Sequence, residues 1–178
     1  MTVREATRVT LVVVVFLTAQ LTVVLDLRLG TVHPDIMVLL PIVAGLVGGP
    51  SSGASMGFGA GLAADLFLPT PFGLSALVGC LIGYTVGVTT LALDRTAGWL
   101  PPVVAFGGSA LYEVIYAVLG SVLGQPQMIH VDLTRVVLVV AVVNAVLALP
   151  ALRLVSWALP AASTEGVPTS TASTGILR

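Results

Sequence analysis

The sequence predicts an all-α fold, a multi-pass transmembrane helical bundle of about six spans. The 178 residues are 57% hydrophobic and only 8% charged, whereas about 25% of a typical soluble domain is charged. The mean hydropathy is +1.10, and several apolar runs approach or exceed the roughly 20 residues that cross a bilayer. A chain with so little charge cannot cover a water-facing surface, so we expect it in a membrane.

Six apolar segments make up a predicted transmembrane domain, residues 1–159. The segments are 9–26, 34–48, 51–68, 72–93, 100–123 and 133–157. Residues that interrupt helices separate them, at 26–33, 48–50, 69–71, 94–95 and 124–126. Residues 160–178 are polar and rich in Ser and Thr, which predicts a disordered tail.

The second segment, 34–48, is short for a span, because 15 residues extend only about 22 Å against a hydrocarbon core of about 30 Å. It either crosses or enters the membrane and returns. Six spans with a cytoplasmic N-terminus leave five arginines inside and two outside, whereas a re-entrant segment leaves three inside and four outside. The arginines therefore favour six spans, with both termini cytoplasmic and the turn at 65–71 on the outer side.

The chemistry of the side chains argues against an enzyme and against nucleic-acid binding. The chain has no lysine, and its seven arginines form no basic patch. Its single cysteine, Cys80, makes neither an intrachain disulfide nor a zinc site. Residues 49–53 spell G-x-S-x-G, but that motif needs a strand-turn-helix context, and His33 and His130 are predicted across the bilayer from it. We expect no catalytic residue, cofactor or metal.

Glycines recur at every fourth position in two neighbouring segments. They are Gly53, Gly57 and Gly61 in segment 51–68, and Gly79, Gly83 and Gly87 in segment 72–93. Helices in lipid associate through close backbone contact between small residues. The spacing therefore predicts that these two helices pack tightly through their glycine faces.

Three polar residues lie near the middle of apolar segments. They are Gln20, Glu113 and Asn144. A charged side chain at the membrane centre costs roughly 2.5–3.5 kcal/mol on insertion scales. A shared interior hydrogen-bond cluster that fixes helix packing explains all three, and a site that handles a proton or ligand is the alternative.

Asp65 lies at the predicted outer end of segment 51–68, where a negative charge is unfavourable for a helix C-terminus. Three groups could hold it: the Thr70 hydroxyl, the exposed amides at the start of the next helix, or a partner protein. The prolines that follow restrict the turn. We therefore expect partner binding at Asp65, Pro69, Pro71, Phe72 and Gly73.

The run GFGAGLAADLFLPTPFGLSAL, residues 57–77, resembles the signature of the rod shape-determining protein MreD family. The residues that carry the resemblance are Gly57, Phe58, Gly61, Leu62, Asp65, Leu66, Pro69, Pro71, Phe72, Gly73, Leu74, Ala76 and Leu77. The pair Pro34 and Asp35, the chain length and the six-segment layout are similar too. The similarity covers about residues 34–90 in detail, and elsewhere only the hydropathy agrees.

This resemblance implies a non-enzymatic scaffold of the bacterial plasma membrane, involved in cell shape and lateral peptidoglycan synthesis. It implies an MreC-like membrane protein as partner, together with the peptidoglycan polymerase and transpeptidase of the elongation complex, all within membrane lipid. It also implies a fold similar to the substrate-binding subunits of energy-coupling-factor transporters. A vitamin-binding subunit of that kind is the alternative function, but segment 9–26 lacks the A-x-x-x-A pattern with which those subunits dock their transport partner.

Overall fold

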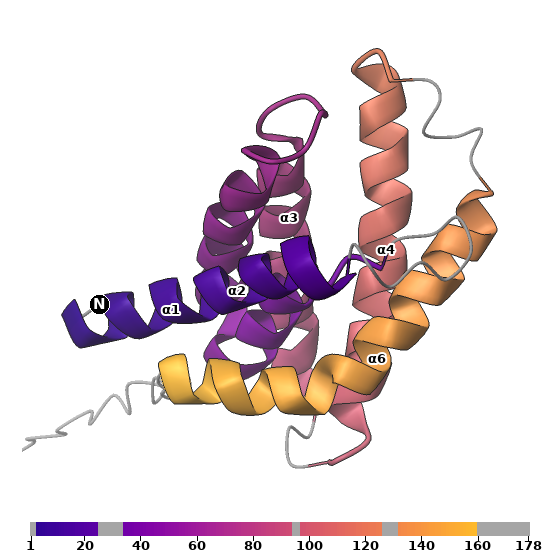
Figure 1. Cartoon of the computed structure of the whole chain (residues 1–178). Helices are drawn as coiled ribbons and strands as arrows, with labels where there is room; N and C mark the ends of the chain where they lie inside the picture. The colour runs from indigo at the N-terminus through magenta and orange to yellow at the C-terminus, as the bar shows by residue number, and fades with distance from the viewer. Residues whose placement is uncertain (1–2, 25–33, 94–96, 126–131, 160–178) are drawn as a thin grey trace, which may run out of the picture.

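The computed structural model of the chain describes residues 3–24, 34–93, 97–125 and 132–159, in which all regular structure is helical (Figure 1). The elements are α1 (Val3–Ala19) with a π-helical turn η1 (Gln20–Val24), α2 (Leu39–Asp65), α3 (Leu74–Thr89) with a 3₁₀ turn η2 (Thr90–Ala92), α4 (Leu100–Val122) and α6 (Leu133–Ala158). The predicted all-α class is confirmed. The predicted tail 160–178, His33 and His130 lie outside the described residues.

Four helical stretches of the described residues are long and apolar enough to cross a membrane. They are Val3–Thr22, Leu39–Asp65, Leu100–Val122 and Leu133–Ala158, and the apolar helix Leu74–Thr89 is shorter. These stretches fit the membrane protein expected from the composition. The predicted count of six spans is not confirmed, and the cytoplasmic placement of both termini stays a prediction from the arginines.

Helix α2 is a hairpin of two helical halves that meet at Gly49. This glycine has φ 79° and ψ −170°, a non-helical conformation open to glycine, and Pro50 follows it. A Cβ built on Gly53 would lie 2.8 Å from the Cα of Gly45, although eight residues of one continuous helix extend about 12 Å. The chain therefore reverses at Gly49, between the predicted segments 34–48 and 51–68.

The two glycine faces predicted from the sequence lie against each other in the hairpin of α2 and α3. A Cβ on Gly57 would overlap the carbonyl of Gly79, and a Cβ on Gly53 would overlap that of Gly83. The pairing continues at both ends. Gly61 meets the backbone of Ser75 and Ala76, and Gly87 meets that of Gly49 and Pro50. Along these contacts the residue numbers increase on α2 while they decrease on α3. The two helices are therefore antiparallel, with their backbones in contact.

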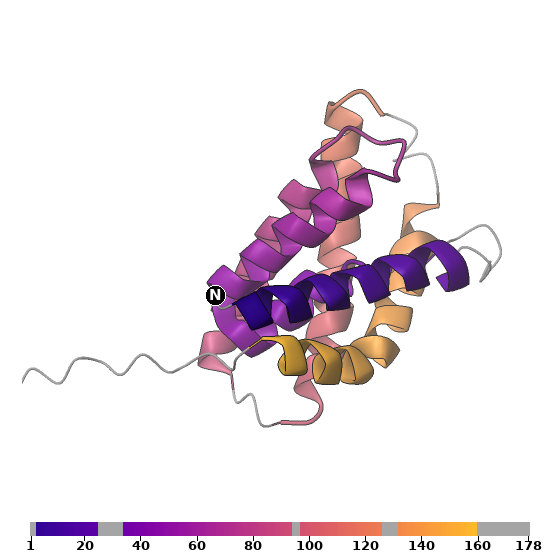
Figure 2. The ribbon, with the colours of Figure 1, turned by 60° about the vertical axis from the view of Figure 1, so that its left-hand side comes forward.

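The first half of α2 forms the centre of the core, since Leu39, Leu40, Ile42 and Val43 are fully buried. Helix α4 lies beside the hairpin, and α6, which contains Pro150, bends along its length (Figure 1). Helix α1 lies across α2 in both views (Figures 1 and 2). Only two of its residues are buried, so α1 is the most loosely packed helix of the described bundle.

We expect Gly57→Ala to destabilise the protein and Gly59→Ala, on the open side of the same helix, to leave it as stable as wild type. A Cβ at Gly57 would force the helices apart, at a cost of about 1–3 kcal/mol. A Cβ at Gly59 meets nothing within 4 Å, and alanine favours a helix by up to about 1 kcal/mol over glycine. Thermal unfolding midpoints in one detergent measure both effects. Equal midpoints for the two variants would contradict the packing role.

Candidate functional site

The turn between α2 and α3 is closed by the carboxylate of Asp65, which is only 4% exposed. This carboxylate accepts hydrogen bonds from the backbone N–H groups of Gly73 at 2.9 Å, Ser75 at 3.2 Å and Ala76 at 3.4 Å. The N–H of Leu74 donates to the carbonyl of Pro71, and that of Leu77 to the carbonyl of Gly73. Every backbone donor at the start of α3 is thus paired. Among the three partners considered for Asp65, the amides of the next helix are the ones it binds.

Local sequence gives the turn its fixed shape. Gly73 has φ 93°, a left-handed conformation that suits glycine, and Pro69 and Pro71 have fixed φ angles and no N–H to satisfy. The Thr70 hydroxyl, which was considered as a partner of Asp65, instead accepts a hydrogen bond from the Tyr116 hydroxyl at 3.0 Å. That contact ties the turn to α4.

The five residues expected to bind a partner, Asp65, Pro69, Pro71, Phe72 and Gly73, differ in accessibility. The carboxylate of Asp65 is buried and accepts hydrogen bonds from backbone amides, so it shapes the turn from inside. The accessible residues are apolar, with Phe72 66% exposed and Leu66 69% exposed. Phe67, Leu68 and Pro69 are also exposed. The turn therefore presents an apolar surface, made of residues 66–69 and 72, on a fixed backbone.

A second irregular stretch, residues 34–38, lies inside the bundle and is held by side chains from two other elements, η1 and α6. The Gln20 amide donates to the carbonyl of Pro34 at 3.2 Å and accepts from the N–H of Ile36 at 2.9 Å. Asn144 donates to the carbonyl of Asp35 and to the hydroxyl of Ser109, both at 2.9 Å. Gln20 and Asn144 thus serve the backbone of this stretch.

The predicted cluster of Gln20, Glu113 and Asn144 is therefore organised differently from the expectation. Its two amides meet through the stretch 34–36 and have no hydrogen bond to each other among those described. Glu113 lies one turn beyond Ser109 on α4, is partly buried, and interacts electrostatically with Asp35. In the sequence, Asp35 was noted only as part of the family resemblance, and its hydrogen bond to the backbone was not predicted. Its position directly after Pro34 at a predicted helix start was the signal for its capping role.

Asp35 caps the first half of α2, because its carboxylate accepts the N–H of Met37 at 2.9 Å. This helix start lies deep in the bundle. Ser109 is the tenth of the 23 residues of α4, and Asn144 the twelfth of the 26 residues of α6. The ten residues 39–48 then extend about 15 Å to the hairpin bend. Among the described side chains, the oxygen Oδ1 of Asn144 is buried with no hydrogen-bond partner.

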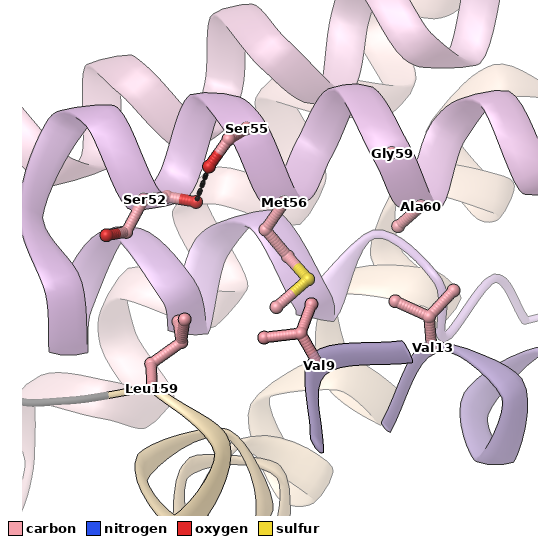
Figure 3. Close-up of a pocket in the computed structure, with 8 residues that line it drawn as sticks. All are labelled: Val9, Val13, Ser52, Ser55, Met56, Gly59, Ala60 and Leu159. Carbon is pink, nitrogen blue, oxygen red and sulfur yellow. Dashed lines mark hydrogen bonds between the residues drawn. The ribbon is translucent and has the colours of Figure 1, made fainter. Parts of the chain in front are cut away.

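A cavity of about 170 Å³ lies between α1, the second half of α2 and the end of α6 (Figure 3). Its lining is Val9, Val13, Ser52, Ser55, Met56, Gly59, Ala60 and Leu159. The Ser55 hydroxyl donates to the backbone carbonyl of Ser52 at 3.2 Å. Six of the eight lining residues are apolar or glycine, so the cavity suits an apolar group.

Residues 49–53, which spell the serine-hydrolase motif, form the bend of the α2 hairpin and the start of its second half. That place is a helix-to-helix turn, without the strand that a nucleophile elbow needs. Within the described residues, no three His, Cys, Asp or Glu side chains lie close enough to hold a metal ion. The described residues thus form an exposed apolar surface on the turn between α2 and α3, and buried polar contacts around residues 34–36.

Replacement of Asp65 with alanine should lower the free energy of unfolding by at least about 1.5–3 kcal/mol, because several buried N–H groups lose a charged acceptor. Asp65→Asn should be intermediate, since the amide keeps one acceptor oxygen. The matched control is Asp132→Ala, at the N-cap of α6, where the side chain makes no capping hydrogen bond. Denaturation in detergent measures all three. An Asp65→Ala protein as stable as the control would refute the capping role.

Asn144→Leu should cost about 1–3 kcal/mol of stability, because the carbonyl of Asp35 loses its donor inside the bundle. Val142→Leu, at an exposed position on the same helix, serves as the control and should change stability little. The comparison uses unfolding midpoints in the same detergent. If the two variants have the same unfolding midpoint, the stability of the stretch 34–36 does not depend on Asn144.

Comparison of the chain with models of known protein families, with curated protein sequences and with solved structures finds no match. Two features of the structure therefore remain as the basis for a function. One is the capped turn between α2 and α3 with its apolar surface, and the other is the enclosed helix start at residues 34–38.

Proposed function

We propose that this chain is an integral membrane scaffold of the bacterial cell-elongation machinery. It would hold an MreC-like membrane protein in the plasma membrane and so support the peptidoglycan polymerase and transpeptidase that build the lateral wall. The resemblance of residues 57–77 to the MreD family supports this proposal. The helices long and apolar enough to cross a membrane agree with it.

The observation that carries the proposal is the rigid turn between α2 and α3. Asp65 fixes its end, two prolines restrict its backbone, and Tyr116 binds Thr70. A surface with so little freedom loses little conformational entropy on binding, which favours affinity. Several residues that resemble the family signature build this turn: Asp65 is its buried cap, and Leu66 and Phe72 are exposed apolar side chains.

The alternative, a vitamin-binding transporter subunit, needs a pocket for its ligand. Small-molecule sites usually measure about 300–1,000 Å³. The cavity beside Asp35, Ser75 and Tyr112 measures about 10 Å³, enough for a water-sized group. The apolar cavity of Figure 3 measures about 170 Å³ and presents two serines as its polar groups. A larger hollow of about 480 Å³ is lined by α1 alone, with Thr7 and Thr10 as its polar groups. None of these three cavities combines ligand size with polar groups that converge from several helices, which favours the scaffold over the transporter subunit.

Phe72→Ala should reduce the recovery of an MreC-like partner while the level of this protein stays unchanged. Loss of an exposed aromatic contact of about 1–2 kcal/mol corresponds to a 5- to 30-fold weaker complex. The tagged protein is purified from its native membrane, and the amount of partner per tagged chain is measured. The matched control is Leu91→Ala, at an exposed apolar position in η2, which follows the opposite end of α3.

Equal partner recovery with wild type and Phe72→Ala would exclude the turn as the contact surface. A wild-type protein that recovers no membrane partner, but binds a vitamin-sized ligand tightly, would replace the scaffold with the transporter subunit. Loss of partner from both Phe72→Ala and Leu91→Ala would indicate a general structural defect and contradict a contact confined to the turn.

A further inference from the structure

We propose that the junction of α1 and α6 binds an anionic phospholipid. The phosphate group lies beside Arg8, with Arg4 and Arg153 on either side, and part of one acyl chain fills the cavity of Figure 3. The proposal requires that the protein is in a membrane, and it depends on no partner protein. Three features support it: the arginines, their level at the helix ends, and the cavity beside them.

The start of α1 lies beside the end of α6 in both views (Figures 1 and 2). The guanidinium carbon of Arg8 lies 5.0 Å from the ring centre of Trp157, and Nη1 of Arg8 donates to the carbonyl of Trp157 at 3.5 Å. Arg4 is one turn from Arg8 on α1, and Arg153 is one turn from Trp157 on α6. The two outer arginines therefore flank the contact, each about 6 Å along its own helix.

The charge of the junction suits an anion. Among residues 3–10 and 150–159, three arginines stand against one acid, Glu5. All three arginines are exposed. A guanidinium has five N–H donors whose planar arrangement matches a phosphate group. The contact with Trp157 uses one donor of Arg8 and holds the group in place, so its other donors can bind a phosphate.

Other helix ends lie at the level of this junction. A Cβ on Gly48, beside the bend of α2, would lie 3.8 Å from Cδ1 of Leu159, which follows the end of α6. A Cβ on Gly87, near the end of α3, would meet the backbone of Gly49 and Pro50 in the same bend. Helices that cross a membrane end near the headgroups, and basic pockets between them bind lipid headgroups. Tryptophan also favours this level.

The cavity of about 170 Å³ begins at the same level and extends into the bundle. Its lining follows α2 from Ser52, just after the bend, to Ala60, over about 12 Å. Ser52 and Leu159 lie at one end of the cavity, and Ala60 lies toward the other (Figure 3). Since Leu159 follows the end of α6, the arginines lie at the Ser52 end.

The junction thus has a positive group and an apolar cavity in the order in which a phospholipid presents its phosphate and its acyl chain. Water would fill the cavity poorly, because a buried water needs two to four polar partners, and the polar residues of the lining are two serines. An acyl chain has the apolar surface that the cavity suits. A lipid with a negative headgroup therefore fits both parts of the site.

Trp157 reports on the site directly. Trp99→Phe leaves it as the one tryptophan of the chain. The purified full-length protein is placed in vesicles that mix phosphatidylcholine with phosphatidylglycerol, and bromine is carried on the acyl chains of one lipid or of the other. Bromine quenches tryptophan on contact, so the two quenching curves give the relative association constant of the two lipids at Trp157.

We expect phosphatidylglycerol to be preferred by at least about fivefold, and Arg8→Gln and Arg153→Gln each to lower this preference by about two- to fivefold. Arg153→Gln leaves the contact of Arg8 with Trp157 in place, so it keeps the test valid if Arg8→Gln does not fold. The matched control is Arg135→Gln, at an exposed position at the start of α6. No preference in the wild type, or an equal loss from Arg135→Gln, would overturn the proposal.

Gly59→Leu tests the place of the acyl chain. A Cβ at Gly59 meets nothing within 4 Å, so leucine fits there and fills part of the cavity. We expect this variant to bind phosphatidylglycerol more weakly although its arginines are unchanged, and wild-type binding would contradict the acyl-chain site.

A final measurement separates a lipid from a free anion. Excess inorganic phosphate, at constant ionic strength, should leave quenching by brominated phosphatidylglycerol unchanged. Recovery of the Trp157 fluorescence would show that the arginines bind phosphate without an acyl chain, and it would overturn the lipid assignment. The vesicles contain no partner protein, so these results are independent of the scaffold proposal and its co-purification test.

Discussion

Backbone hydrogen bonding in a low-dielectric surrounding is the constraint on which the rest of this structure depends. A continuous helix satisfies its own backbone, but this chain interrupts its helices at Gly49 and at two places where side chains bind the free backbone groups. At residues 34–38 the side chains of Gln20, Asn144 and Asp35 bind the free backbone groups. At residues 73–76 the carboxylate of Asp65 does so. These four polar side chains thus bind backbone groups at helix starts.

The close contact of α2 and α3 follows from the same surroundings. Apolar side chains gain little from contact with each other when lipid is the alternative, so helices associate where their backbones approach closely. The glycines remove the side chains that would hold the helices apart, as at Gly57 with Gly79 and Gly53 with Gly83. The contact also includes the first half of α2 through Gly45. These contacts fix the ends of α2 and α3 relative to each other, and so they hold the turn between them in place.

The described polar groups and the described turn differ in what they contact. The buried polar groups bind backbone, and the turn presents Phe72 and its apolar neighbours outward. In contrast, α1 packs through two buried residues, and the adjoining cavity in Figure 3 is apolar.

The sequence by itself determined the helical class, the apolar helices long enough to cross a membrane, the break before Pro50 and the glycine faces, because run length and four-residue spacing are local properties of a helix. It also narrowed the partners of Asp65 to three, including the amides of the next helix. Only the tertiary structure decided that Gln20 and Asn144 bind the stretch 34–36, through contacts that join residues 16 and 109 positions apart. It alone showed that the carboxylate of Asp65 is buried and that Thr70 binds Tyr116. Such pairings depend on how the helices pack, and the local sequence around either residue does not specify its distant partner.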